Sequence, residues 1–121
     1  MQLVSIESYI ENEQLRPLVA AASGGINIAF WWTSGSDFGT EGKFRWTATG
    51  EPFSFTNWDF GQPSQGLLAP FGPIENAVVF VGATMKWWDY PAFLPNVFVC
   101  EMRWTYIIWL RYNKKHWKQA V

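Results

Sequence analysis

Two polar side chains flank a proline in the stretch NWDFGQPSQ, residues 57–65. Gln62 supplies an amide oxygen and Ser64 a hydroxyl, directly after an aromatic segment and a Phe-Gly turn. Hard cations are bound by oxygen donors, so half of a cation-and-ligand site is one interpretation of these residues. An ordinary turn is the other interpretation, because proline and serine are common turn residues.

The composition limits the classes of function. The chain has 121 residues, 49% of them hydrophobic and 16% charged, which predicts one domain with a packed core. A net charge of −1 gives no sign of the excess positive charge that nucleic-acid binding requires. No apolar run approaches the roughly 20 residues of a membrane span. His116 is the only histidine, and no Ser-His or Cys-His pair or zinc-type cluster is evident, which argues against an enzyme.

The elements that would position these residues form a helix followed by many short strands. Ser8 and Glu11 make a capping-box pattern that starts the helix, and Pro17 predicts a kink or an early stop. A turn is expected at residues 34–37. Alternating or apolar patterns predict strands at 3–6, 28–33, 43–47, 53–58, 77–81, 85–90 and 97–100. This order indicates an α+β fold.

Seven segments, in this order, resemble the C-type lectin-like domain, especially that of secreted arthropod C-type lectins. They read LVSIES, FWWTSGSD, GKFRWTATGEP, TNWDFGQPS, ENAVVF, KWWDYP and FVCE. The resemblance covers residues 1–103 and implies short antiparallel sheets, a long irregular ligand loop and one retained helix. Residues 104–121 lie outside it and are expected to form an unrelated apolar and basic tail.

The resemblance also implies a calcium site. In that family a Glu-Pro-Asn motif goes with mannose-type sugars and a Gln-Pro-Asp motif with galactose-type sugars, and residues 62–64 read Gln-Pro-Ser here. A Trp-Asn-Asp motif supplies two more ligands, and residues 87–89 read Trp-Trp-Asp. The implied metal ligands are Gln62, Ser64, Glu75 and Asp89. One carboxylate and one amide oxygen are missing from this set, so we expect Ca²⁺ binding to be weak or lost.

Each candidate residue also has a structural interpretation. Trp88 can stack on the apolar face of a sugar ring or simply pack. Glu75 can be a surface acid at a strand start, and Asp89 a turn acid before Tyr90-Pro91. Two further acids, Asp37 and Glu41, align with auxiliary calcium ligands of some family members and are treated as ordinary loop acids.

The family's two disulfides are not retained. One would join the positions of Ala77 and Ala92, both alanine here. The other would join Cys100 to a first helix that, with the strand before it, would precede Met1. We therefore expect Cys100 to be an unpaired thiol and the segment 104–110 to fill part of the gap, packed on the core.

A carbohydrate-binding lectin domain with a weakened galactose-type calcium site is the favoured function. It would be secreted and act in innate immunity by resemblance, although no signal peptide is evident in this chain. One alternative is a calcium-independent domain that binds a protein partner through the apolar loop Leu67–Ile74. Another is a truncated product without a function.

Overall fold

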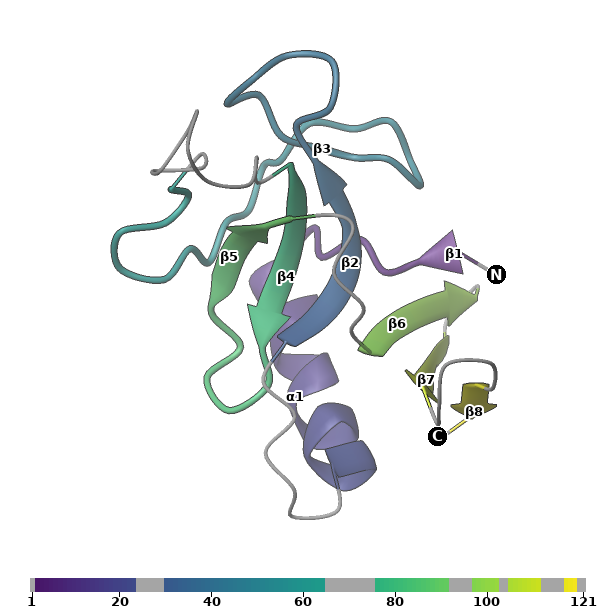
Figure 1. The fold of residues 1–121 in the computed structure, drawn as a ribbon. Helices are drawn as coiled ribbons and strands as arrows, with labels where there is room; N and C mark the ends of the chain where they lie inside the picture. The colour runs from purple at the N-terminus through teal and green to yellow at the C-terminus, as the bar shows by residue number, and fades with distance from the viewer. Residues whose placement is uncertain are drawn as a thin grey trace.

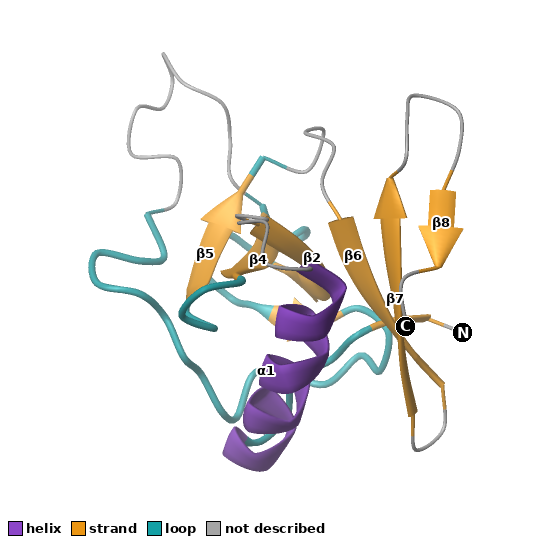
Figure 2. Cartoon of the chain, turned by 90° about the horizontal axis from the view of Figure 1, so that it is seen from below, coloured by secondary structure: helices purple, strands orange, loops and turns teal. Residues whose placement is uncertain are grey.

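The structure is a computed structural model that describes residues 2–23, 30–64, 76–91, 97–102, 105–111 and 117–119. In this part of the chain, helix α1 (Tyr9–Ser23) lies against one face of an eight-stranded sheet (Figures 1 and 2). The strands are β1 Gln2–Leu3, β2 Phe30–Ser36, β3 Arg45–Trp46, β4 Ala77–Val81, β5 Trp87–Tyr90, β6 Val97–Met102, β7 Thr105–Arg111 and β8 Trp117–Gln119.

The sheet follows the order β5-β4-β2-β6-β7-β8, with β1 on β6 and β3 on β2. Strands β2 and β6 are parallel, with Trp31 opposite Val97, and the other pairs are antiparallel. A helix on a largely antiparallel sheet is the α+β architecture that the sequence predicts. Strand β5 forms one edge of this sheet, which matters for the site described below.

The start of helix α1 follows the capping pattern in the sequence. The Ser8 hydroxyl accepts a hydrogen bond from the backbone N–H of Glu11 at 3.1 Å, and the Glu11 carboxylate accepts one from the N–H of Glu7 at 2.8 Å. These bonds satisfy backbone donors that a helix N-terminus leaves without partners.

Of the two outcomes expected at Pro17, a kink or an early stop, the early stop does not occur, because α1 continues to Ser23. Because proline has no backbone N–H, Pro17 removes one helical hydrogen bond and destabilises the helix by about 3 kcal/mol or more. The burial of Leu15 and Val19 against the sheet offsets that cost, since each fully buried aliphatic side chain contributes about 1.5–3 kcal/mol.

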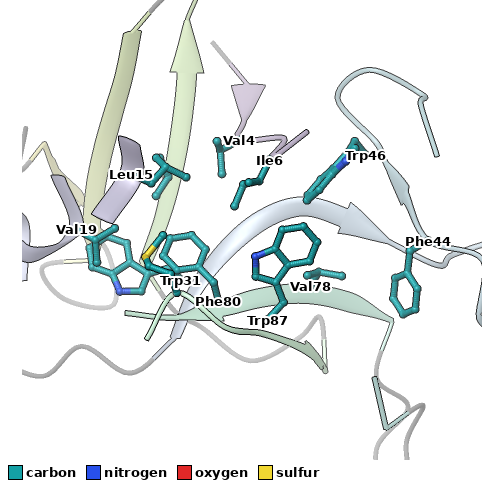
Figure 3. Close-up of a cluster of buried hydrophobic side chains, with 12 residues drawn as sticks. Val4, Ile6, Leu15, Val19, Trp31, Phe44, Trp46, Val78, Phe80 and Trp87 are labelled. Carbon is teal, nitrogen blue, oxygen red and sulfur yellow. The ribbon is translucent and has the colours of Figure 1, made fainter. Parts of the chain in front are cut away.

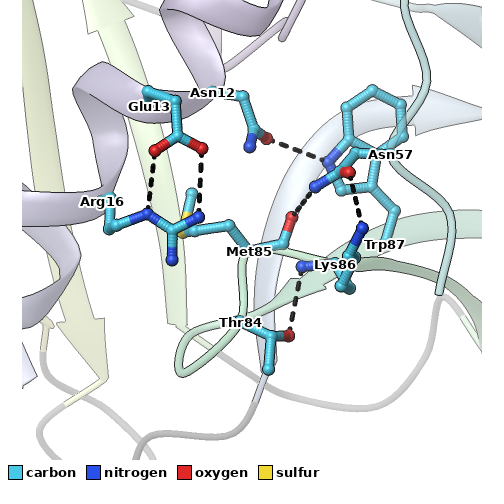
Figure 4. Close-up of polar contacts among 8 residues, drawn as sticks. All are labelled: Asn12, Glu13, Arg16, Asn57, Thr84, Met85, Lys86 and Trp87. Carbon is cyan, nitrogen blue, oxygen red and sulfur yellow. Dashed lines mark hydrogen bonds and ion pairs between the residues drawn. The ribbon is translucent and has the colours of Figure 1, made fainter.

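A polar contact fixes the helix on the sheet (Figure 4). Asn12, only 1% exposed, accepts a hydrogen bond at 3.3 Å from the indole N–H of Trp87 on β5. The buried indole therefore has its one donor satisfied, and the helix is held in register with the strand that carries Asp89.

The buried core is rich in aromatic rings (Figure 3). Trp31 and Phe80 lie parallel with ring centroids 6.1 Å apart, and Trp46 meets Trp87 edge to face at 5.5 Å. The core cluster comprises Val4, Ile6, Leu15, Val19, Trp31, Phe44, Trp46, Val78, Phe80, Met85, Trp87 and Val99. Much of the chain's high aromatic content is therefore accounted for by packing.

Strand β2 extends through residues that the sequence assigns to a turn. The Thr33 hydroxyl donates to the Val78 carbonyl at 2.8 Å, and the N–H of Ser34 donates to the Val4 carbonyl at 2.9 Å. These partners satisfy polar groups inside the sheet, so the strand continues to Ser36.

Residues 53–58 do not form the predicted strand. The segment is irregular in the described structure. Its bridges to strands are isolated ones, between Pro52 just before it and Arg45, and between Trp58 at its end and Trp87. Phe53 and Phe55 instead turn their rings against Trp87, with centroids 5.6 Å from it in each case. Packing of these rings on the core replaces ladder pairing.

The described parts of segment 104–121 extend the sheet as strands β7 and β8. Strand β7 pairs antiparallel with β6 from Phe98↔Trp109 to Met102↔Thr105, and β8 pairs with β7. Within β6, Cys100 lies opposite Leu3 on one side and Ile107 on the other, while Ala92 lies outside the described residues. Among the described helices, none is long and apolar enough to cross a membrane.

Candidate functional site

The loop before the Gln-Pro-Ser segment is fixed along the outer edge of β5. The Asn57 side-chain amide donates to the Met85 carbonyl at 2.7 Å (Figure 4). The backbone carbonyl of Asn57 accepts a hydrogen bond from the N–H of Trp87 at 2.9 Å. The N–H of Asp59 then donates to the Trp87 carbonyl at 3.0 Å. Pairing with an edge strand thus sets the position of residues 57–59.

A tight turn carries the chain from this edge to the candidate ligands. The N–H of Gln62 donates to the Asp59 carbonyl at 3.0 Å, and Gly61 takes a φ of 79°, a backbone conformation that favours glycine. The Gln62–Pro63 peptide bond is cis. The turn leads the chain through Gln62 to Ser64, which lies beside Asp89 on β5.

Ser64 and Asp89 are in direct contact. The backbone N–H of Ser64 donates to Asp89 Oδ1 at 2.8 Å, and its hydroxyl reaches the same oxygen at 3.2 Å. Asp89 is 1% exposed, so a buried carboxylate receives both bonds. The structure therefore brings together two predicted ligands from segments 25 residues apart.

The amide of Gln62 has a buried oxygen that the described residues leave without a hydrogen bond. A buried acceptor without a partner costs about 1–3 kcal/mol, and such atoms in folded proteins mark missing water, ions or ligands. Among the described residues, the Gln62 oxygen is therefore an acceptor that a water or an ion could satisfy.

Two acids at the end of β2 add negative charge near Asp89. Asp37 is 2% exposed and accepts a hydrogen bond from the N–H of Gly42 at 2.9 Å. Desolvation raises the pKa of Glu41 above its ordinary value, and the charges of Asp37 and Asp89 raise it further. Asp37 and Glu41 are expected from the sequence to be ordinary loop acids, and their alignment with auxiliary calcium ligands is the signal that points to their grouping near Asp89.

Trp88 faces the opposite side of the sheet from Asp89, because successive side chains of a strand alternate. Its ring centroid lies 5.7 Å from that of Phe30, and its indole N–H donates to the Asp59 carboxylate at 2.8 Å. This hydrogen bond, followed by one from the Phe60 N–H, lowers the pKa of Asp59. The contacts of Trp88 fit the packing interpretation and also tie the loop to β5.

Two predicted elements of the site lie outside the described residues: Glu75 and the loop Leu67–Ile74. Within the described part of the chain, no three His, Cys, Asp or Glu side chains gather closely enough to hold a metal ion. The described donors are the Gln62 amide oxygen, the Ser64 hydroxyl and the Asp89 carboxylate. These oxygens are of the type that calcium prefers, but they are fewer than the six to eight it takes.

Comparisons with known proteins give a consistent picture of the fold. No model of a protein family matches the chain. A C-type lectin of Aedes aegypti, mosGCTL-7, is 31% identical over 64 residues, which are 53% of this chain and 43% of the mosquito protein. The chain therefore matches less than half the length of that relative.

Solved structures match more of the chain. The carbohydrate-recognition domain of mouse scavenger receptor C-type lectin has a TM-score of 0.65 and 25% identity, covering 79% of this chain and 67% of that one. C-type lectin CEL-I from Cucumaria echinata has a TM-score of 0.62 and 26% identity, covering 79% and 64%. Human lithostathine has a TM-score of 0.66 and 26% identity, covering 81% and 70%.

The architecture, the contact between the Gln-Pro-Ser segment and β5, and these similarities all lead to one assignment. This chain has the C-type lectin-like fold.

Proposed function

We propose that this domain binds carbohydrate of the galactose type through a calcium site of reduced affinity. The observation that carries the proposal is the buried amide oxygen of Gln62, which has no hydrogen-bond partner among the described residues. It belongs to the same short segment as Ser64, which contacts the buried carboxylate of Asp89. A cation bound between these oxygens would satisfy the amide and neutralise the carboxylate.

The reduced affinity follows from the donor set. Ser64 offers a hydroxyl where the Gln-Pro-Asp motif has a carboxylate, and Trp88 offers only a backbone carbonyl where the family has an asparagine. Calcium affinity in oxygen sites depends on ligand charge and number. Glu75 is the remaining proposed ligand, and the acids Asp37 and Glu41 make the neighbourhood more negative and so more attractive to a cation.

We infer a binding role and not a catalytic one, together with an extracellular location and a part in innate recognition. The support for these inferences is the resemblance of the sequence to secreted arthropod lectins, together with the match of a C-type lectin of Aedes aegypti to half of the chain. Two of the similar structures with at least 25% identity, from mouse scavenger receptor C-type lectin and cow CD23, are carbohydrate-recognition domains by description.

Thermal unfolding with and without calcium tests the proposal. Millimolar calcium should raise the Tm of the full chain, and EDTA should reverse the shift, because an ion that binds only the folded state stabilises it. Asp89→Asn removes the buried charge while keeping an oxygen that can accept both Ser64 bonds, so it should abolish the shift.

A matched control uses an acid far from the site. Glu7→Gln removes a charge from an exposed side chain before helix α1 and should leave the calcium shift unchanged. Binding to immobilised galactose should follow the same pattern. An absent shift in the native chain would reject the ion site, and retained binding to a protein partner would then favour the calcium-independent alternative through Leu67–Ile74.

A further inference from the structure

A half-open pocket of about 380 Å³ lies between residues 42–45 and residues 52–58. Its lining includes none of the candidate calcium ligands. The residues that define its chemistry are Lys43, Arg45 and Thr56, with the aromatic residues Phe44, Phe53 and Trp58. A volume near the lower end of the ~300–1,000 Å³ range of ligand pockets suits a single ring and not an extended chain.

Three aromatic rings form the apolar part of this pocket. Phe53 lies 5.6 Å from Phe44 at an interplanar angle of 25° and 6.1 Å from Trp58 at 34°. Trp46 and Trp87 pack behind Phe53, with centroids 4.1 and 5.6 Å away. The buried core therefore holds these rings in place, and Figure 3 shows Phe44 at one end of the buried cluster. Phe44 is only 9% exposed, so the half-buried rings of Phe53 and Trp58 are the ones that offer a rigid surface for stacking.

The polar part of the lining is cationic. Lys43 and Arg45 are both exposed, and among the described residues of the lining there is no acidic side chain. The guanidinium of Arg45 donates one bond, to the Gly50 carbonyl at 3.3 Å, which leaves most of its donors for other partners. The described part of the chain contains one ion pair, Arg16–Glu13, so neither cation of the pocket is neutralised there.

Two cations beside rigid rings, in a chain with a net charge of −1, match a particular class of ligand. A guanidinium fork binds carboxylate or sulfate oxygens, and a ring face accepts the C–H face of a pyranose. We propose that this pocket binds a single anionic sugar unit that carries a sulfate or a carboxylate. The anion would lie on Lys43 and Arg45, and the sugar ring on the aromatic residues. This binding goes beyond the proposed galactose-type site because it requires no calcium.

Calorimetric titration of the full chain in EDTA tests the inference. The probes are galactose 6-sulfate, glucuronic acid, unmodified galactose and inorganic sulfate. One or both anionic sugars should bind at least about tenfold more tightly than galactose or free sulfate, since only they engage both halves of the pocket. The two anionic sugars separate a sulfate ligand from a carboxylate one. Equal binding of galactose, or equal binding of free sulfate, would overturn the proposal.

Substitutions locate the binding. Lys43→Gln and Arg45→Gln should each weaken the anionic sugar roughly five- to tenfold, as expected for the loss of a charge-assisted contact. Lys86→Gln removes an exposed cation outside the pocket and should change affinity less than about twofold. An equal loss in Lys86→Gln would show that the attraction is general and not local.

The outcome is independent of the calcium site. EDTA keeps that site empty throughout, so failure of the anionic sugars to bind would reject the pocket and leave the galactose-type proposal intact. Asp89→Asn, in turn, should abolish the calcium shift while leaving the titration in EDTA unchanged.

Discussion

Ser64→Asp would restore the carboxylate that a Gln-Pro-Asp motif provides, and its effect can be worked out from the contact with Asp89. The serine hydroxyl lies 3.2 Å from Asp89 Oδ1, so an aspartate there would place a second charge about 4 Å from a carboxylate that is 1% exposed. At an effective dielectric constant of about 20, two like charges at that distance repel by about 4 kcal/mol. The hydroxyl hydrogen bond to a charged group, worth about 1.5–3 kcal/mol, is lost as well.

Part of this penalty is relieved when the half-buried side chain turns toward solvent, while the backbone bond from residue 64 remains. We therefore expect the free energy of unfolding to fall by about 2–4 kcal/mol without calcium. At about 4 °C per kcal/mol for a domain of this size, the Tm falls by roughly 8–16 °C. Calcium at 100 times its Kd should raise the free energy of unfolding of this variant by about 2.7 kcal/mol, which corresponds to an increase in Tm of roughly 10 °C.

The assay is thermal unfolding followed by circular dichroism in EDTA and in millimolar calcium. Ser64→Asn has nearly the same shape without the charge, and Ser54→Asp places the charge on an exposed serine elsewhere, so both should show smaller calcium shifts than Ser64→Asp. A variant as stable as the native chain in EDTA would refute the contact with Asp89. A destabilised variant that calcium does not rescue would refute the ion site.

The remaining predictions concern the anchoring of helix α1 and the acidic end of β2. Asn12→Ala leaves the buried indole N–H of Trp87 without its partner and should lower the free energy of unfolding, measured by urea titration, by about 1–3 kcal/mol. The control Gln14→Ala changes an exposed residue of the same helix and should alter the free energy of unfolding by no more than about 0.5 kcal/mol. Equal effects of the two substitutions would count against the Asn12–Trp87 contact. Because the pKa of Glu41 is raised in the folded protein, the folded state binds the proton of this carboxyl more tightly than the unfolded state does. The ionisation of Glu41 therefore lowers the free energy of unfolding as the pH rises through and above the ordinary pKa of 4.5. Glu41→Gln should therefore raise the Tm in EDTA at pH 7 and change it little at pH 4, and the opposite pH trend would contradict this electrostatic assignment.

Parts of the fold could be predicted because local pattern and burial agree. The apolar run at residues 77–81 is a strand with those bounds, and the capping residues Ser8 and Glu11 start the helix. Where the prediction failed, tertiary contacts override local preference. Ser34 and Ser36 are expected in a turn, but they remain in β2, where the N–H of Ser34 donates to the Val4 carbonyl just beyond β1.

The candidate site was only partly accessible from the sequence. The resemblance identifies Gln62, Ser64 and Asp89 as candidates, but no pattern reveals that the amide oxygen of Gln62 is buried without a described partner. That property depends on a turn fixed by an edge strand more than 20 residues away in sequence. The cations Lys43 and Arg45 likewise match no motif, and their significance comes from the rings that packing places beside them.

The geometry of the 57–64 loop explains how ligands can be lost from such a site without loss of the fold. The loop is held by backbone and amide bonds to Met85 and Trp87, and Trp58 packs 5.9 Å from the Trp87 ring. None of these contacts involves an ion. The course of the loop is therefore set by the β5 edge and the aromatic core, so we expect substitutions at the proposed ligands Gln62 and Ser64 to change the shape of the loop little.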